Sequence, residues 1–132
     1  MTRPLPLTTP DTQWWWEGLN EKKLLIQRCE GCHRPRHPPV PSCPSCHSLE
    51  WNATPASGRG IVYSVTVLHH PPLPGFDYPL AVAVIELAEG TRIVSNVVGS
   101  DPDQVHIGQA VEVEFFDVEG GARLHRFRVV QP

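Results

Sequence analysis

The stretch CEGCHRPRHPPVPSCPSCH, residues 29–47, decides the fold of this chain because it contains all four of its cysteines. The cysteines form two hooks, Cys29 with Cys32 and Cys43 with Cys46, in the pattern C-x2-C-x10-C-x2-C. Two such hooks place four thiolates around one ion, as tetrahedral Zn²⁺ requires. We therefore predict one structural Zn²⁺ bound by all four cysteines. Iron in the same cage is the main alternative, and disulfides are least favoured because a reducing cytoplasm keeps thiols reduced.

The spacer between the hooks, HRPRHPPVPS, cannot form a helix because its four prolines fix φ and lack an N–H donor. It is expected to cross as an extended strap, which makes the segment a rubredoxin-type ribbon rather than a DNA-reading finger. His33, His37 and His47 could each replace a sulfur ligand, but four cysteines already close the shell. A closed shell has no open position for water or substrate, which favours a structural over a hydrolytic metal.

Composition bounds the class of protein. The 132 residues include 11 Lys plus Arg against 14 Asp plus Glu, so no basic field exists to attract nucleic acid or an anionic membrane. The N-terminus, MTRPLPLTTPD, has no apolar run like a signal peptide, and no stretch approaches the roughly 20 apolar residues of a membrane span. We expect a cytoplasmic protein. The proline-rich beginning suits a tail or a linker, so the chain is expected to be a domain cut from a longer polypeptide.

A short helical arm precedes the ribbon. Thr9 can cap it, Pro10 fits its first position, and Gly18 can end it. The consecutive residues WWW, 14–16, fan over most of the circumference of such a helix, so one small core can hardly bury all three. Two indoles are expected to pack inside and the third either stays half exposed or contacts a partner or ligand. The candidates for that contact are Trp14, Trp15 and Trp16.

The C-terminal two thirds of the chain predicts strands. Five segments rich in β-branched residues are separated by glycine-containing turns, at residues 58–68, 80–87, 91–98, 110–116 and 123–130. Two hairpins, 80–98 and 110–130, follow from the short connections. The fold class is therefore mainly β: a helical arm, a rubredoxin-like zinc ribbon and a five-stranded OB-fold barrel. The predicted domains are residues 1–28 for the tail and arm, 29–56 for the ribbon and 57–132 for the barrel.

OB-folds often bind single-stranded nucleic acid through stacking aromatics and a basic groove. Segments 80–87 and 91–98 offer no aromatic residue and only Arg92 as a base, which disfavours that function. Arg126 and Arg128 alternate onto one face of the last strand, where they meet a phosphate, a carboxylate or only solvent. The loop HHPPLPGFDYP, residues 69–79, is stiffened by prolines and either recognises a partner through Phe76 and Tyr78 or covers the barrel mouth.

Taken together, several motifs resemble one family. The tryptophan-bearing helix, the two C-x2-C hooks with CPSC, and the stretches SLEW, GRGIVYSVTV, YPLAVAVIELAEGTRIVSNVV and VHIGQAVEVEF are similar to acyl-CoA-associated proteins that join a rubredoxin-like zinc ribbon to an OB-fold. The resemblance runs from about Trp14 to Val130. It is strongest to the domain appended to the actinobacterial steroid side-chain enoyl-CoA hydratase, which partners a thiolase-like retro-aldolase. The metal ligands carry over as Cys29, Cys32, Cys43 and Cys46, and the resemblance supplies no catalytic residue.

The resemblance implies a noncatalytic accessory subunit or domain, which docks on and activates a thiolase-superfamily acyl-CoA enzyme and associates with an enoyl-CoA hydratase by fusion or contact. The chain alone is expected to have no activity. An alternative is a module that itself binds acyl-CoA and passes it between hydratase and lyase. A less favoured alternative is a ribbon-and-barrel protein that binds single-stranded nucleic acid.

Overall fold

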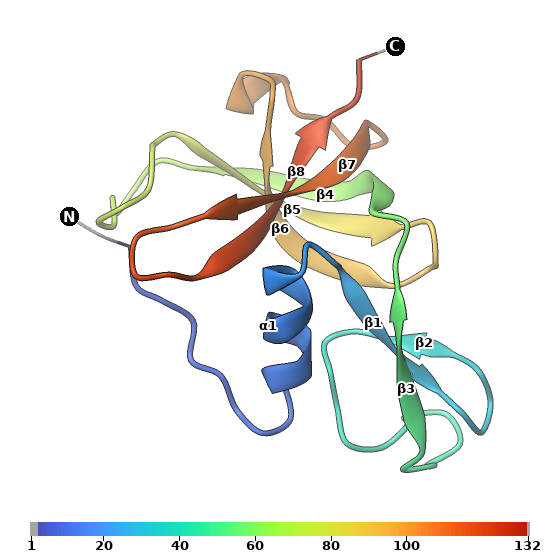
Figure 1. Cartoon of the computed structure of the whole chain (residues 1–132). Coiled ribbons are helices and arrows are strands. Elements are labelled where there is room, and N and C mark those ends of the chain that lie inside the picture. The colour runs from blue at the N-terminus through green and yellow to red at the C-terminus, as the bar shows by residue number, and fades with distance from the viewer. Residues whose placement is uncertain (1–2, 132) are drawn as a thin grey trace.

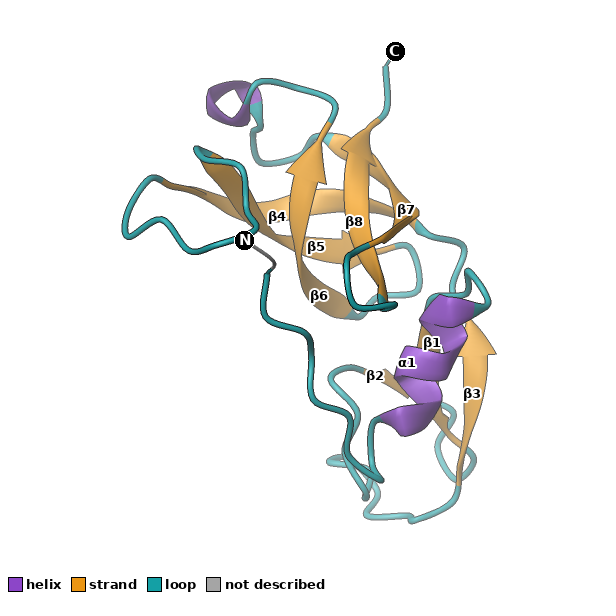
Figure 2. Cartoon of the chain, turned by 60° about the vertical axis from the view of Figure 1, so that its left-hand side comes forward, coloured by secondary structure: helices purple, strands orange, loops and turns teal. Residues whose placement is uncertain are grey.

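The computed structural model describes residues 3–131, which form one helix, a three-stranded sheet and a closed barrel (Figures 1 and 2). Helix α1 covers Gln13–Asn20. Strands β1 (Leu25–Cys29), β2 (Pro35–Arg36) and β3 (Trp51–Pro55) form an antiparallel sheet in the order β2-β1-β3. This sheet carries the cysteine loops at one end, and α1 lies beside it (Figure 1). The mainly β fold class is thereby confirmed.

The barrel has five strands, as predicted. They are β4 (Arg59–Leu68), β5 (Leu80–Leu87), β6 (Arg92–Val98), β7 (Ala110–Asp117) and β8 (Arg123–Val129). They close in the order β4-β5-β6-β8-β7, with β6 and β8 parallel and the remaining pairs antiparallel. A one-turn 3-10 helix, η1 (Pro102–Gln104), follows β6. Both predicted hairpins, β5–β6 and β7–β8, are present and their bounds match the sequence pattern to within two residues.

Helix α1 differs from the prediction at both ends. It begins at Gln13 rather than Pro10, because a turn comes first, in which the Thr9 carbonyl accepts hydrogen bonds from the amides of Thr12 and Gln13 at 3.0 and 2.9 Å. Gly18 does not end the helix. It is buried within it, and a Cβ there would lie 2.7 Å from Cδ1 of Leu25, so glycine lets β1 approach the helix closely.

The buried side chains form one continuous core. Trp15 and Leu19 from α1, and Leu24 and Ile26 from the ribbon side, belong to the same cluster as the barrel interior, which centres on Phe127. The helix therefore fills the space between the ribbon sheet and one end of the barrel. Strand β1 runs across the predicted boundary at residue 28, and the division into three domains stays a prediction.

The outer face of β5 is only partly covered. Its inward residues are buried, whereas the outward ones are half-buried. Val84 pairs across the strands with Val94 of β6, which is 63% exposed, and Ile61 and Tyr63 of β4 are 44% and 47% exposed on the same side. The Arg92 guanidinium lies 3.7 Å from the Tyr63 ring centroid, and the rest of this outer face is partly exposed.

No helix among the described residues is long and apolar enough to cross a membrane.

Candidate functional site

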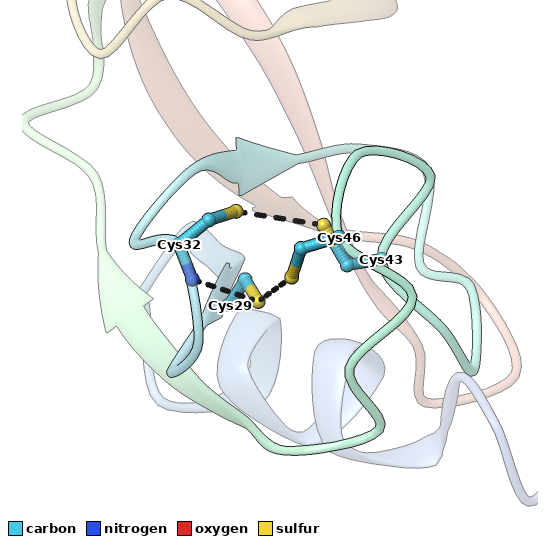
Figure 3. A group of neighbouring side chains, drawn as sticks. All are labelled: Cys29, Cys32, Cys43 and Cys46. Atoms are coloured by element: carbon cyan, nitrogen blue, oxygen red, sulfur yellow. Dashed lines mark hydrogen bonds between the residues drawn. The ribbon is translucent and has the colours of Figure 1, made fainter.

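The four cysteines converge at one end of the ribbon (Figure 3). Their sulfur atoms all lie within 4.8 Å of one another, with 3.5 Å between Cys29 and Cys46 and 3.6 Å between Cys32 and Cys43. A tetrahedral ion with metal–sulfur bonds of about 2.3 Å needs sulfur–sulfur edges of about 3.8 Å. The cage therefore fits a four-thiolate metal site.

Each hook is built from the same backbone turn. The amide of His33 donates to the Cys29 carbonyl at 3.0 Å, and the amide of His47 donates to the Cys43 carbonyl at 2.9 Å. Both histidines have positive φ, 66° and 64°, a conformation that non-glycine residues seldom adopt. The cage of four cysteines includes none of the three histidines considered as alternative ligands. His33 and His47 instead lie at the position after each hook where the chain turns back.

Backbone amides around the sulfurs favour thiolate at two positions. The amide of Cys32 and then that of Gly31 lower the pKa of Cys29. The amides of Cys46 and Ser45 lower the pKa of Cys43 to about 6. The amide of Ser48 also lowers the pKa of Cys46, but the sulfurs of Cys29, Cys32 and Cys43 together with burial outweigh it, and the pKa is raised to about 11. Four sulfurs this close cannot all carry charge without a cation, which is what a metal ion supplies.

The strap between the hooks is also fixed at its centre. Gln27 of β1 is 2% exposed, and its Oε1 accepts hydrogen bonds from Arg36 Nε at 3.0 Å and from the Val40 amide at 2.9 Å. Arg36 also donates to the Val40 carbonyl at 3.2 Å. The strap is thus held at both ends by the cysteine hooks and in the middle by a buried polar group.

The three consecutive indoles, of Trp14, Trp15 and Trp16, pack against different neighbours. Trp15 is 6% exposed and contacts the barrel, with its ring centroid 5.4 Å from that of His125. Trp14 is half-buried and packs on Trp51 of β3 at 4.9 Å. Trp16, also half-buried, meets the Trp15 ring edge to face at 4.7 Å. Helix α1 lies between two sheets, so both sheets cover its indoles. The prediction assumed that only one core lies beside the helix. Partner contact by these residues stays a prediction.

Arg126 and Arg128, two further candidate contact residues, lie on β8 beside β7. Arg126 and Arg128 both pair with Glu114 of β7, at 2.6 Å for Arg128 Nε, and these arginines lower the pKa of Glu114, Arg128 first. The guanidinium of Arg126 also lies 4.4 Å from the Phe116 ring centroid. Of the three expected partners, a phosphate, a carboxylate or solvent, the two arginines therefore have a carboxylate, and it belongs to the chain itself.

Phe76 and Tyr78 organise the loop before β5. Both are half-buried, and Tyr78 Oη accepts a hydrogen bond from the Leu73 amide at 3.0 Å. The guanidinium of Arg3 lies 4.3 Å from the Phe76 centroid, so the N-terminal segment packs on this loop. Their contact with a partner or ligand stays a prediction.

One group of residues went unnoticed in the sequence. His125 lies inside the barrel end, where its Nδ1 is 2.8 Å from Ser95 Oγ, and His37 of the strap packs on Trp15 with ring centroids 5.7 Å apart. The two-residue period of β8 could have placed His125 on the inner face with Phe127 and Val129, but nothing local indicates that His37 lies near it.

Comparison with known proteins identifies relatives across nearly the whole chain. Residues 16–52 match the family model "ChsH2, rubredoxin-like zinc ribbon domain", and residues 53–116 match "ChsH2, C-terminal OB-fold domain". A chain of the solved structure "Ltp2-ChsH2(DUF35) aldolase" is similar with a TM-score of 0.90 and 43% identity, over 95% of this chain and 98% of that one.

Three curated relatives add context. A probable enoyl-CoA hydratase alpha subunit of Thermomonospora curvata is 44% identical over 98% of this chain. The 3-oxo-4,17-pregnadiene-20-carboxyl-CoA hydratase alpha subunit of Mycobacterium tuberculosis is 39% identical over 85% of it. The chain spans only 41% and 36% of those two proteins. A DUF35 domain-containing scaffold protein of Methanocaldococcus jannaschii is 36% identical over 76% of this chain and 73% of its own length.

Proposed function

The chain belongs to the ChsH2 family of joined rubredoxin-like zinc ribbons and OB-folds, and we propose that it is a noncatalytic accessory subunit or domain that docks on and activates an acyl-CoA enzyme. The observation that carries this proposal is the match, over 95% of this chain and 98% of the matched chain, to a chain of the solved structure "Ltp2-ChsH2(DUF35) aldolase". The scaffold relative supports a role in assembly. The partner class is a thiolase-superfamily enzyme, as the resemblance of the sequence implies.

We propose that the partner is a retro-aldolase of steroid side-chain degradation. The relative that acts on a pregnadiene carboxyl-CoA supports this substrate class. The complex would cleave a β-hydroxyacyl-CoA that carries a tertiary alcohol. The alcohol loses its proton and becomes a ketone as the carbon–carbon bond breaks, and the released carbanion equivalent gains a proton to give propionyl-CoA. The catalytic acid and base belong to the partner in this scheme.

The metal in this proposal is Zn²⁺, bound by Cys29, Cys32, Cys43 and Cys46. A cage of four thiolates supplies no open coordination position, so the ion contributes stability rather than a catalytic step. Its effect on the chain is to fix both ends of the strap. The division into an arm (1–28), a ribbon (29–56) and a barrel (57–132) belongs to the same proposal.

For the docking surface we propose the partly exposed outer face of β4, β5 and β6. Four apolar side chains lie on this face beside the Glu86–Arg92 ion pair, and exposed apolar patches commonly mark interfaces: Ile61, Tyr63, Val84 and Val94. The half-buried residues Trp14, Trp16, Phe76 and Tyr78, and the ion-paired Arg126 and Arg128, are further candidates for contact. Trp15 is buried and acts through packing.

A second candidate function is an acyl-CoA-binding module that passes ligand from a hydratase to the lyase. The two hydratase alpha subunits among the relatives favour it. Titration of the isolated chain with acyl-CoA separates the two functions, because a carrier binds the ligand without a partner and a docking subunit does not.

Coexpression with a tagged candidate aldolase, followed by purification through the tag, tests the docking. The wild-type chain should copurify in a fixed ratio, and Ile61→Glu on the outer face should abolish this. Ile107→Glu is the matched control, since Ile107 is 68% exposed in the connection before β7. Copurification that both variants leave unchanged would refute this surface, and no copurification of the wild type would refute the docking role.

A further inference from the structure

A cavity of about 380 Å³ opens where the strap, helix α1 and the barrel meet. The strap contributes His37, Pro38 and Pro39 to its walls. The helix contributes Trp15 and Trp16, and the barrel contributes residues of β6 and β8, among them Val94 and His125. This volume lies within the range of about 300–1,000 Å³ that is usual for small-molecule sites. The three walls come from parts of the chain that are far apart in sequence.

The walls are apolar but carry a few hydrogen-bonding groups. His37 and His125 lie on the Trp15 ring, with centroids 5.7 and 5.4 Å away. His125 Nδ1 is hydrogen-bonded to Ser95, so its other ring nitrogen is its remaining polar atom. The indole Nε1 of Trp15 is buried and has no hydrogen-bond partner among the described residues. Because that nitrogen is not accessible from the cavity, a polar ligand atom would pair with the imidazole nitrogens instead.

The walls offer a ligand no free charge. Burial lowers the pKa of His37 and lowers that of His125 to about 4, so both imidazoles are neutral at pH 7. Arg92, the charged residue among the described lining residues, is held 3.3 Å from Glu86 and lies 3.7 Å from the Tyr63 ring centroid. A charged ligand group would lose its hydration without a counter-charge, which favours an uncharged one.

The wall formed by the strap depends on the cysteine cage. His37, Pro38 and Pro39 lie between Cys32 and Cys43, and the Gln27 side chain fixes the strap on either side of them through Arg36 and Val40. Beside these anchors, the pairing of β2 with β1 just before His37 and the contact of His37 with Trp15 hold this wall in place.

We propose that this cavity binds an uncharged apolar ring system that carries a hydrogen-bonding oxygen, and that the metal-held strap forms the wall that makes binding possible. The aromatic wall, in which the His37 ring is tilted and the His125 ring perpendicular to the Trp15 indole, suits an apolar ring system, and the neutral imidazole nitrogens suit a hydroxyl or carbonyl oxygen. This site belongs to the single chain, so ligand binding can be tested without an aldolase and independently of docking.

The probe for this site is 2-naphthol, followed by the NMR signals of the four tryptophan indole N–H groups. The signals of Trp15 and Trp16 should shift and that of Trp51, outside the cavity, should not. We expect a dissociation constant on the order of 10⁻⁴ to 10⁻³ M, well inside the affinity ceiling for a molecule of this size. Naphthalene should bind several-fold more weakly and 2-naphthalenesulfonate at least tenfold more weakly. Uniform shifts of all indoles, or tighter binding of the sulfonate, would overturn the proposal.

Three substitutions locate the site. Val94→Asp places a charge at the wall of the cavity and should weaken 2-naphthol binding at least tenfold, whereas Ile107→Asp, at an equally exposed site elsewhere, should leave it unchanged. His37→Phe keeps a ring on Trp15 but removes its nitrogens, so the preference for 2-naphthol over naphthalene should fall. Equal effects of the two aspartates, or a preference that survives in His37→Phe, would contradict the assignment.

The role of the strap is tested in metal-loaded protein. Gln27→Ala removes the acceptor for Arg36 and Val40, and should weaken binding several-fold while the cysteine cage retains its metal. Gln27→Glu, the matched control, keeps the acceptor and should bind as the wild type does. If folded Gln27→Ala binds 2-naphthol unchanged, the strap is not the wall that the site needs. If Gln27→Ala does not fold, mild chelation of the wild type with the barrel signals intact must abolish binding, and retained binding refutes the role.

Discussion

Replacing Trp15 by alanine should cost more stability than any other change in the helical arm. The side chain is 6% exposed and lies between the strap and the barrel. A tryptophan buries about 150–250 Å², and at about 25 cal/mol per Å² its removal costs about 4–6 kcal/mol. Partial collapse of the space that the indole leaves reduces this cost to about 3–5 kcal/mol. That is a large part of the unfolding free energy of about 5–15 kcal/mol that is usual for a whole domain.

Equilibrium urea unfolding of the metal-loaded protein, followed by circular dichroism, measures this cost. Trp14→Ala removes a half-buried ring and should cost about half as much. Trp15→Phe keeps a ring and removes the unpartnered Nε1, so it should cost less than half of the alanine change. A loss below about 1 kcal/mol for Trp15→Ala, or a larger loss for Trp14→Ala, would refute the placement of the helix between the two sheets. If no folded tryptophan variant weakens partner assembly, the predicted interface role of these residues is wrong.

Three other predictions concern the ribbon and the buried histidine. Cys43→Ser, or removal of the metal by a chelator, should unfold at least the ribbon, because structural zinc supplies about 10–16 kcal/mol of apparent binding free energy. Elemental analysis should find one metal ion per wild-type chain. Substoichiometric metal in folded protein would contradict this prediction. His33→Gly should stabilise the chain by about 0.5–1 kcal/mol, since φ is 66° there, while Glu30→Gly, where φ is not positive, should destabilise it; thermal melts compare them. The pKa of His125 is lowered to about 4 by burial, so the unfolded chain binds this proton first and stability falls as pH decreases from about 6.5 to about 4, by up to about 3 kcal/mol. His125→Gln should lack this part of the pH slope in urea unfolding, and an identical slope would show that the group does not titrate as described.

The strands of the barrel could be predicted because local signals agree with the fold. Each has a β-branched pattern and is bounded by glycine turns, and β4 to β8 match those segments closely. Strands β2 and β3 have no counterpart among the predicted elements, since Pro35–Arg36 and Trp51–Pro55 are short and become strands only by pairing with β1. The convergence of the cysteine hooks also followed from spacing alone.

Other features depend on tertiary contacts that no local pattern encodes. Thr9 and Pro10, which predicted the start of the helix, instead form the turn before it. Gly18 allows close packing against Leu25 and does not end the helix. The pairing of Arg126 and Arg128 with Glu114 requires the register of β7 against β8. The cavity near His37 and His125 could not be predicted, because its walls meet only when the strap folds over the helix.

The most direct test of the accessory role is a reconstitution titration of a thiolase-superfamily aldolase with this chain. The partner is assayed for cleavage of a β-hydroxyacyl-CoA at increasing amounts of the chain, and each protein is assayed alone. The account predicts no turnover by the chain alone, low turnover by the partner alone, and activity that rises with added chain and saturates at a fixed ratio. A fully active partner without the chain, or turnover by the chain alone, would contradict it.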